Sequence, residues 1–301
     1  MAAKEAEGVA LSAERDVMGL ALMREYYSHQ PALYSTPNDL HELLQCLSTP
    51  LPCTVRLNLS AAAAASDIGH LDEKIWRPRY CMSQWLLDEG EKRREERTHC
   101  AWECPGSMFG ERERAMGNAL VGSGLLRYQE IVSMLSPVML RPILIAACTL
   151  PSPSANLTSS AVRLLDMCAA PGSKTLLLHE LHQQHKKASP SVRPLTIIAN
   201  DSQSKRCGNA LHRLRSSGCF SAMVTCADAA EYPSMTDDCG REVAYDLVVA
   251  DVPCSGDGTW RKSPSLRRSW DPAHAAHLHA LQLRILRRGL QLLGDQVRNP
   301  G

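Results

Sequence analysis

The chain has 301 residues, is 44% hydrophobic and 22% charged, and carries a formal net charge of +1 from 33 basic and 32 acidic residues. This composition is typical of a globular protein with a sizeable core, and the length suits one large domain or two. The charge balance neither indicates nor excludes a nucleic-acid partner, because binding needs a local basic surface rather than a basic total. The 12 cysteines are scattered and follow a charged N-terminus without an apolar export core, which excludes a secreted disulfide scaffold and favours a reducing compartment.

The first part of the chain predicts short helices and one strand. Residues 11–29 have apolar positions at helical spacing, and residues 39–46 form a second short helix that prolines at 50 and 52 follow. Residues 54–58 alternate apolar and polar side chains, which is typical of a strand. The alanine run 61–65 leaves helix and insertion open, and the mixed charges of 88–97 favour a solvated helix face.

After Gly117 the pattern changes to helix and strand alternation. Residues 128–135 are expected to be helical and 151–156 to be a loop, and the apolar stretch 138–150 is too short and too interrupted to span a bilayer, since it contains Arg141 and Pro142. Strands follow at 161–168, 195–200, 222–227 and 245–251, with helices at 173–185, 203–216 and 277–293. Nearly continuous apolar strands between helices predict an α/β, doubly wound parallel sheet.

The first predicted strand of this sheet ends in a loop of small residues, Leu164-Leu-Asp-Met-Cys-Ala-Ala-Pro-Gly-Ser-Lys-Thr, and a helix follows directly. Small residues let a ligand approach the backbone in the crevice at the carboxyl edge, where open α/β sheets bind ligands. The first N–H groups of the helix suit an anionic group. The chain contains no P-loop sequence and no GxGxxG dinucleotide sequence, which argues against a nucleotide triphosphate or a dinucleotide.

Acidic residues follow three further strands of the predicted sheet, at Asp201, Asp228 and Asp251. Carboxyl ends of parallel strands meet at one edge, so these side chains are expected to face the same crevice. A carboxylate after the second strand can accept both ribose hydroxyls of a nucleoside. Aspartate is common at any transition from strand to loop, and this simpler interpretation applies to each residue alone better than to the ordered set.

The segment Asp251-Val-Pro-Cys-Ser-Gly-Asp-Gly-Thr places a cysteine in a tight loop after the last of these strands. Cytosine C5 is a poor nucleophile, and its methylation needs a thiolate that adds to C6 and is later eliminated. A cysteine at this edge fits that demand. Cys254 could instead be a small buried residue, but that interpretation explains neither the two glycines nor the adjoining aspartate.

Together, Asp166–Thr175, Asn200-Asp201 with Lys205-Arg206, Asp228-Ala229 and Asp251–Thr259 resemble the NOL1/NOP2/Sun family of RNA cytosine-5 methyltransferases, and within it the eukaryotic tRNA-modifying enzymes. The likeness covers roughly residues 40–60 and 125–294. It implies a Rossmann-like S-adenosylmethionine (SAM)-dependent methyltransferase sheet in residues 121–301, incomplete at its C-terminus. Residues 1–120 would then form a smaller α+β accessory region that binds RNA.

The resemblance also implies roles for individual residues. SAM would be held by Asp201 and Asp228 at its ribose and adenine ends and by the loop after the first strand, Cys168, Ala169, Ala170, Pro171, Gly172, Ser173 and Lys174. Asp251 would lie near the methyl donor and the target base, and Cys254 would help to release the product. In this family the attacking cysteine belongs to a TCS motif on the next strand.

No TCS tripeptide occurs in the chain, and Thr225-Cys226-Ala227 comes one strand too early. The chain is therefore expected to stop before its nucleophile, with an unpaired sheet edge beside the last strand. Two alternatives stay open. The first is a catalytically silent SAM- or RNA-binding protein. The second is a DNA cytosine methyltransferase in which Cys254 itself attacks, although the glycine motif and ENV tripeptide of those enzymes are missing.

Partners are indicated less directly. A cluster of cationic residues near Trp260 and Trp270 follows the cysteine loop and suits phosphate contacts and base stacking by RNA, most naturally tRNA: Arg261, Lys262, Arg267 and Arg268. Further arginines at 284, 287 and 288 fit either RNA contacts or a solvated helix face. A metal site is not expected, because His99, Cys100 and Cys104 lack a second ligand pair. A membrane partner is not expected either. The family implies the nucleus, including the nucleolus, or the cytoplasm, and oligomeric state is not indicated.

Overall fold

The computed structural model describes residues 18–33, 36–58, 75–78, 101–149, 161–236, 239–240, 242–263 and 265–294. The predictions for residues 11–17, 61–65, 88–97, His99-Cys100 and 151–156 lie outside them. The chain falls into two compact units, each taken over its described residues. The larger comprises Cys53–Cys104, Phe109–Val252 and Leu283–Gly301, and the smaller Met1–Pro52, Pro105–Met108 and Pro253–Gln282.

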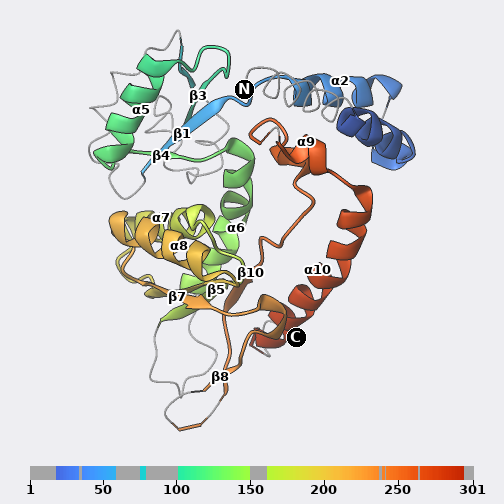
Figure 1. The fold of residues 1–301 in the computed structure, drawn as a ribbon. Helices are drawn as coiled ribbons and strands as arrows, with labels where there is room; N and C mark the ends of the chain where they lie inside the picture. The colour runs from blue at the N-terminus through green and yellow to red at the C-terminus, as the bar shows by residue number, and fades with distance from the viewer. Residues whose placement is uncertain are drawn as a thin grey trace, which may run out of the picture. The chain divides into compact units, whose positions relative to one another are not determined.

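A four-stranded parallel sheet forms the centre of the larger unit, with the order β10-β5-β6-β7 (Figure 1). Its strands are β5 (Val162–Asp166), β6 (Leu195–Asp201), β7 (Ala222–Cys226) and β10 (Leu247–Val249). From β5 the chain first adds β6 and β7 on one side of the sheet and later adds β10 on the other side, so the order of the strands reverses at β5. The doubly wound parallel sheet predicted from the apolar strands is therefore confirmed.

Three helices cover this sheet with apolar side chains: α6 (Ile131–Thr149), α7 (Ser173–Ala188) and α8 (Ser204–Ser216). Leu144 of α6 and Leu177 of α7 share one buried cluster with Leu164 of β5, and Leu214 of α8 packs in a second with Ala199 of β6. Burying apolar faces between helices and sheet is the main favourable term in such a fold.

The helix α6 departs from the prediction. It runs through Pro137 and Pro142 for 19 residues, so the apolar stretch is neither as short nor as interrupted as expected. By length and composition alone it could cross a membrane. Its buried side chains, including Met134 and Val138, belong to the core cluster beneath the parallel sheet, as in the core helix of a globular unit.

A second, antiparallel sheet in the larger unit has the order β2-β3-β1-β4. Its strands are β1 (Cys53–Leu57), β2 (Arg77–Pro78), β3 (Ala101–Cys104) and β4 (Leu126–Tyr128), and α5 (Glu111–Gly122) precedes β4. Tyr128 pairs with Val55 in this sheet, so the predicted helix at 128–135 begins three residues later, with α6. Two short strands, β8 (Met235–Thr236) and β9 (Glu242–Val243), pair separately.

An ion pair joins the small sheet to the helices of the parallel sheet. Arg56 of β1 donates to Glu180 of α7 at 2.5 Å and to Gln129 at 2.7 Å, and the side chains of Arg56 and Glu180 are 2% and 1% exposed. The small sheet therefore packs against the helices of the parallel sheet, across the predicted boundary at residue 120. The functional division into 1–120 and 121–301 stays a prediction.

The smaller unit consists of helical residues 18–28, η1 (Pro31–Leu33), α2 (Pro37–Ser48), η4 (Asp257–Thr259) and α9 (Ser265–Ser269). The helix α10 (Pro272–Leu292) runs from this unit into the larger one. The rings of Trp260 and Trp270 lie edge to face with their centroids 5.9 Å apart. Both are buried with Met23, Leu44 and Leu47. Within the larger unit, Leu293 then bridges Tyr245 in parallel, directly before β10.

Candidate functional site

The candidate site is the carboxyl edge of the parallel sheet in the larger unit, where the strand order reverses between β5 and β10. Asp166 ends β5 opposite Val249 of β10 and Ala199 of β6. Such a reversal leaves a crevice, because the chain leaves the two neighbouring strands toward opposite faces of the sheet. The predicted cofactor residues Cys168 to Lys174 follow directly after Asp166 at this edge.

A tight turn brings the backbone of this loop to the start of α7. The Ala169 amide donates to Asn200 at 2.7 Å, and the Gly172 amide donates to Ala169 at 2.7 Å. Gly172 precedes the first residue of α7 with φ of 93°, a conformation that side chains with a Cβ disfavour. The first N–H groups of α7 follow this turn directly, and the N-terminus of a helix favours anionic groups.

Asn200 is a site residue that the sequence analysis quoted only as part of a motif. It is fully buried at the end of β6. Its amide nitrogen donates to Met167 and Ala227, and its amide oxygen accepts from Thr225 and from the Ala227 backbone. One side chain thus fixes the ends of three strands. An amide both donates and accepts, whereas a carboxylate only accepts, but the partners of Asn200 cannot be identified from the sequence.

Asp201, the next residue, is 3% exposed and keeps its carboxylate at the crevice. One oxygen lies 3.2 Å from Arg206, and the other accepts the Gln203 amide at 3.0 Å. Arg206 also donates to the Ala170 carbonyl at 2.8 Å, so it ties the acid to the cofactor loop. A carboxylate has about four lone-pair positions, so Asp201 can still accept hydroxyl groups from a ligand.

Asp228 and Asp251 occupy the ends of the two outer strands. Asp228 follows β7, and its side chain accepts the Ala230 amide at 2.9 Å at the start of η3 (Ala229–Glu231). Asp251 follows β10 and accepts from Lys174 of α7 at 2.6 Å. This ion pair links α7, which follows β5, to the end of β10. The side chains of Lys174 and Asp251 are 22% and 55% exposed, so solvent screens the pair.

Burial sets the protonation of two groups in the loop. It raises the pKa of Asp166 to about 6, against the opposing hydrogen bonds from Thr175 and the Cys168 amide. Burial, together with the charges of Asp166, Asp201 and Asp251, raises the pKa of the Cys168 thiol to about 12. Cys168 therefore stays protonated at neutral pH, and a protonated thiol is neither a strong nucleophile nor a metal ligand.

Cys254 belongs to the smaller unit, which begins again at Pro253, and its side chain is exposed. The loop after it is anchored by Asp257, which accepts from the Tyr27 hydroxyl and from the Trp270 indole at 2.8 Å. Burial alone would raise the pKa of Asp257, but hydrogen bonds from Ser255, Tyr27 and Trp270 outweigh it and lower that pKa. The contact of Tyr27 with Asp257 was not predicted, because the two residues are 230 positions apart in the sequence.

The cluster predicted to contact RNA has mixed surroundings. Trp260 and Trp270 are 0% and 7% exposed, so the expectation that they stack on bases is wrong: both are core residues of the smaller unit. Arg261 donates to the carbonyls of Thr49 and Pro50 at the end of α2, which occupies much of its guanidinium. Lys262 and Arg268 are exposed, and the side chain of Arg267 lies outside the described residues.

A metal centre has no support in the part of the chain that the structure describes. No group of three or more His, Cys, Asp and Glu side chains there is arranged to hold an ion. Cys104 is buried, and its pKa is raised first by that burial, which disfavours the thiolate that metals bind.

A family model described as 16S rRNA methyltransferase RsmB/F matches residues 156–299, which include the whole candidate site. Over these residues the chain is similar to this family. This is the NOL1/NOP2/Sun family of RNA cytosine-5 methyltransferases, so the resemblance stated from the motifs is confirmed.

Curated relatives of the family agree. The chain is 34% identical over 181 residues to a Drosophila melanogaster tRNA (cytosine(34)-C(5))-methyltransferase, covering 57% of this chain and 21% of the relative. It is 29% identical over 298 residues to a Saccharomyces cerevisiae multisite-specific tRNA:(cytosine-C(5))-methyltransferase, covering 91% and 39%. The chain thus spans less than half the length of either relative.

Two solved structures share the fold. NSun6 from Pyrococcus horikoshii, determined with SFG, an analogue of SAM, matches with a TM-score of 0.54 and 16% identity over 91% of this chain and 80% of that one. A methyltransferase homologue from the same organism matches with a TM-score of 0.53 and 19% identity over 85% and 65%. The chain therefore shares the fold of these two structures, and the predicted Rossmann-like parallel sheet is confirmed.

Proposed function

We propose that the protein methylates C5 of cytosine in RNA, with tRNA as the substrate and SAM as the methyl donor. The carrying observation is the convergence of Asp166, Asp201, Asp228 and Asp251 on the carboxyl edge of one sheet, beside the glycine turn that begins α7. The names of the tRNA-modifying relatives support the choice of RNA class. SAM, when bound, supplies an activated methyl group.

The residues at this edge fit such a cofactor. Asp201 and Asp228 would accept the ribose hydroxyls and the adenine end, since a carboxylate can hold two hydroxyls at once. The N–H groups of Ser173 and Lys174 at the start of α7 would bind the methionine carboxylate. The neutral Cys168 thiol and the small residues Ala169, Ala170, Pro171 and Gly172 would line the approach without competing for charge.

The target base would be handled by Asp251 and Cys254. Methylation at C5 needs a thiolate that adds to C6, makes C5 nucleophilic, and leaves as the proton on C5 is removed. The resemblance assigns the attack to a TCS motif and product release to the cysteine after proline, here Cys254. The exposed side chain of Cys254 supports a role toward a large substrate. Arg261, Lys262, Arg267 and Arg268 would contact RNA phosphates nearby, Arg261 with only part of its guanidinium.

Methyl transfer tests the proposal. The chain is incubated with methyl-labelled SAM and unmodified tRNA transcripts, beside a version extended through a strand that carries a TCS motif. We expect label in 5-methylcytosine with the extended protein and its loss on Asp251→Ala. If the 301-residue chain itself labels RNA and Cys254→Ala abolishes this, Cys254 is the nucleophile and the two-cysteine assignment is wrong. If neither protein labels RNA but both bind SAM, the catalytically silent alternative holds.

A further inference from the structure

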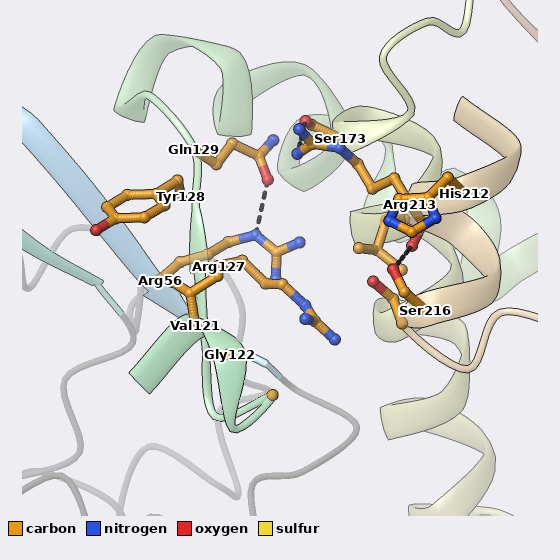
Figure 2. A pocket seen from close by; sticks show the side chains of 13 residues that line it. Arg56, Val121, Gly122, Arg127, Tyr128, Gln129, Ser173, His212, Arg213 and Ser216 are labelled. Carbon is orange, nitrogen blue, oxygen red and sulfur yellow. Dashed lines mark hydrogen bonds between the residues drawn. The ribbon is translucent and has the colours of Figure 1, made fainter. Parts of the chain in front are cut away.

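A second concave site lies in the larger unit, between the small sheet and the helices α7 and α8. It is a pocket of about 390 Å³, lined by strand residues that include Arg56 and Arg127 and by helix residues that include Ser173, His212, Arg213 and Ser216 (Figure 2). Figure 2 shows the arginines from both sides directing their guanidinium groups into the space between the elements. Apart from Ser173, the proposed methyl transfer uses none of these residues.

The pocket is strongly cationic. Three guanidinium groups line it, and no Asp or Glu is among its lining residues. The neighbouring Glu180 lies 2.5 Å from Arg56 and 3.8 Å from Arg127, so in the described part of the chain this carboxylate contacts two of the three guanidinium groups. The like charges of Arg56 and Arg213 disfavour the charged form of Arg127, and an anion among the three would relieve that repulsion.

Hydrogen-bond donors in the pocket are incompletely used. Arg56 is 2% exposed, yet among the described residues its Nη2 has no hydrogen-bond partner. The buried Nε of Arg127 also has none there. A buried unpaired guanidinium donor is costly, and native proteins almost always supply a partner. Burial lowers the pKa of Arg127 and Arg213, which is the expected mark of cations held away from water without full compensation.

The rim of the pocket is open to a large ligand. His212 and Ser216 of α8 are exposed, whereas Arg56 forms the deep end. The Ser216 and Ser173 hydroxyls lie among the lining groups, and Arg213 donates to Ser173 at 3.0 Å. Forked guanidinium donors with adjacent hydroxyls match the oxygens of a phosphate group in number and geometry.

We propose that this pocket binds a phosphate group, and that its source is a phosphodiester of the RNA backbone. The choice of RNA as the source rests on the proposed function, whereas the phosphate chemistry rests on Arg56, Arg127 and Arg213 alone. An open rim with a deep cationic end suits a polymer that runs past the pocket and places one phosphate inside it. Such a contact positions RNA without reading its sequence.

RNA binding by the full chain tests this site. Anisotropy titrations of a labelled unmodified tRNA transcript are run over a salt series for the natural protein, Arg127→Gln, Arg213→Gln and the matched control Arg215→Gln. Arg215 is exposed on the same helix and does not line the pocket. We expect each pocket variant to bind about tenfold more weakly, with the slope of log K against log salt reduced by about one, and the control to be unchanged.

A second readout separates the sources of the phosphate group. Inorganic phosphate, at constant ionic strength against chloride, is expected to raise the Tm of the natural protein and of Arg215→Gln but not of Arg213→Gln. Stabilisation by phosphate with RNA affinity unchanged in the pocket variants would overturn the RNA source and favour a free phosphate compound. No difference among the variants in either readout would overturn the site itself.

SAM binding by the same variants, measured by calorimetry, distinguishes a failure of the phosphate site from a failure of the proposed function. Retained SAM affinity with weakened RNA binding shows that the pocket variants are folded and supports the site. A natural protein that fails to bind SAM but binds RNA through Arg127 and Arg213 would overturn the methyltransferase proposal and leave the phosphate site standing.

Discussion

Replacing Glu180 with glutamine is expected to destabilise the larger unit severely. The substitution keeps the shape of the side chain but removes a carboxylate that contacts both Arg56 and Arg127. Because the Arg56 side chain is only 2% exposed, water cannot replace the lost charge. Removing one partner from a buried ion pair costs ~3–5 kcal/mol, and the amide oxygen that can still accept from Arg56 places the expected loss near ~3 kcal/mol.

Urea unfolding followed by far-UV circular dichroism measures this loss. The control is Glu231→Gln, which breaks an ion pair with Arg284 of similar length, 2.7 Å, but with 54% and 72% exposed side chains. An exposed pair of this kind contributes about 0–1 kcal/mol. The double variant Arg56→Met with Glu180→Leu is expected to regain part of the stability, because it removes the buried charge of Arg56 together with that of its partner, although Arg127 loses the same carboxylate. A loss for Glu180→Gln no larger than for Glu231→Gln would refute the reasoning.

Three further predictions concern the candidate site. The pKa of Asp166 is raised from 3.8 to about 6, so the folded protein loses stability as the pH rises from about 4 to about 6. Asp166→Asn should remove about 3 kcal/mol of that loss. Unfolding curves of the variant with the same pH dependence as those of the natural protein would contradict this. Gly172→Ala should cost about 1–2 kcal/mol, measured by thermal unfolding, and weaken SAM binding, because φ is 93°. Gly289→Val should cost about 1–3 kcal/mol, since a Cβ there lies 3.1 Å from Met167 Sδ, whereas Gly208→Val, with open space around it, should cost less.

The parallel sheet was predictable from the sequence because its signals are local. Continuous apolar runs marked β5, β6, β7 and β10, and acidic residues marked where β6, β7 and β10 end. The small sheet was predictable only in part: the alternation over 54–58 marked β1, whereas Tyr128 pairs with Val55 although its own segment has a helical pattern. The prolines of α6 also misled the analysis, since tertiary packing against β5 and α7 keeps the helix intact.

The same distinction holds for the sites. The loop Cys168 to Lys174 and the aspartates could be predicted because they follow strands directly, and their roles still await experiment. Three features could not be predicted: the hydrogen bonds of Asn200 to neighbouring strands, the hydrogen bond from Tyr27 to Asp257, and the cationic pocket. Arg56 and Glu180 are 124 residues apart, and only the folded chain brings them together in a buried position.

Calorimetric titration of SAM into the purified chain tests the central claim most directly, because it asks whether the crevice holds the cofactor, apart from any catalysis. We expect one site, with affinity at least tenfold weaker for Asp201→Ala and for Asp228→Ala and unchanged for the surface variant Arg215→Gln. A natural protein that does not bind SAM, or aspartate variants that bind it as tightly as the natural protein does, would contradict the assignment of this crevice.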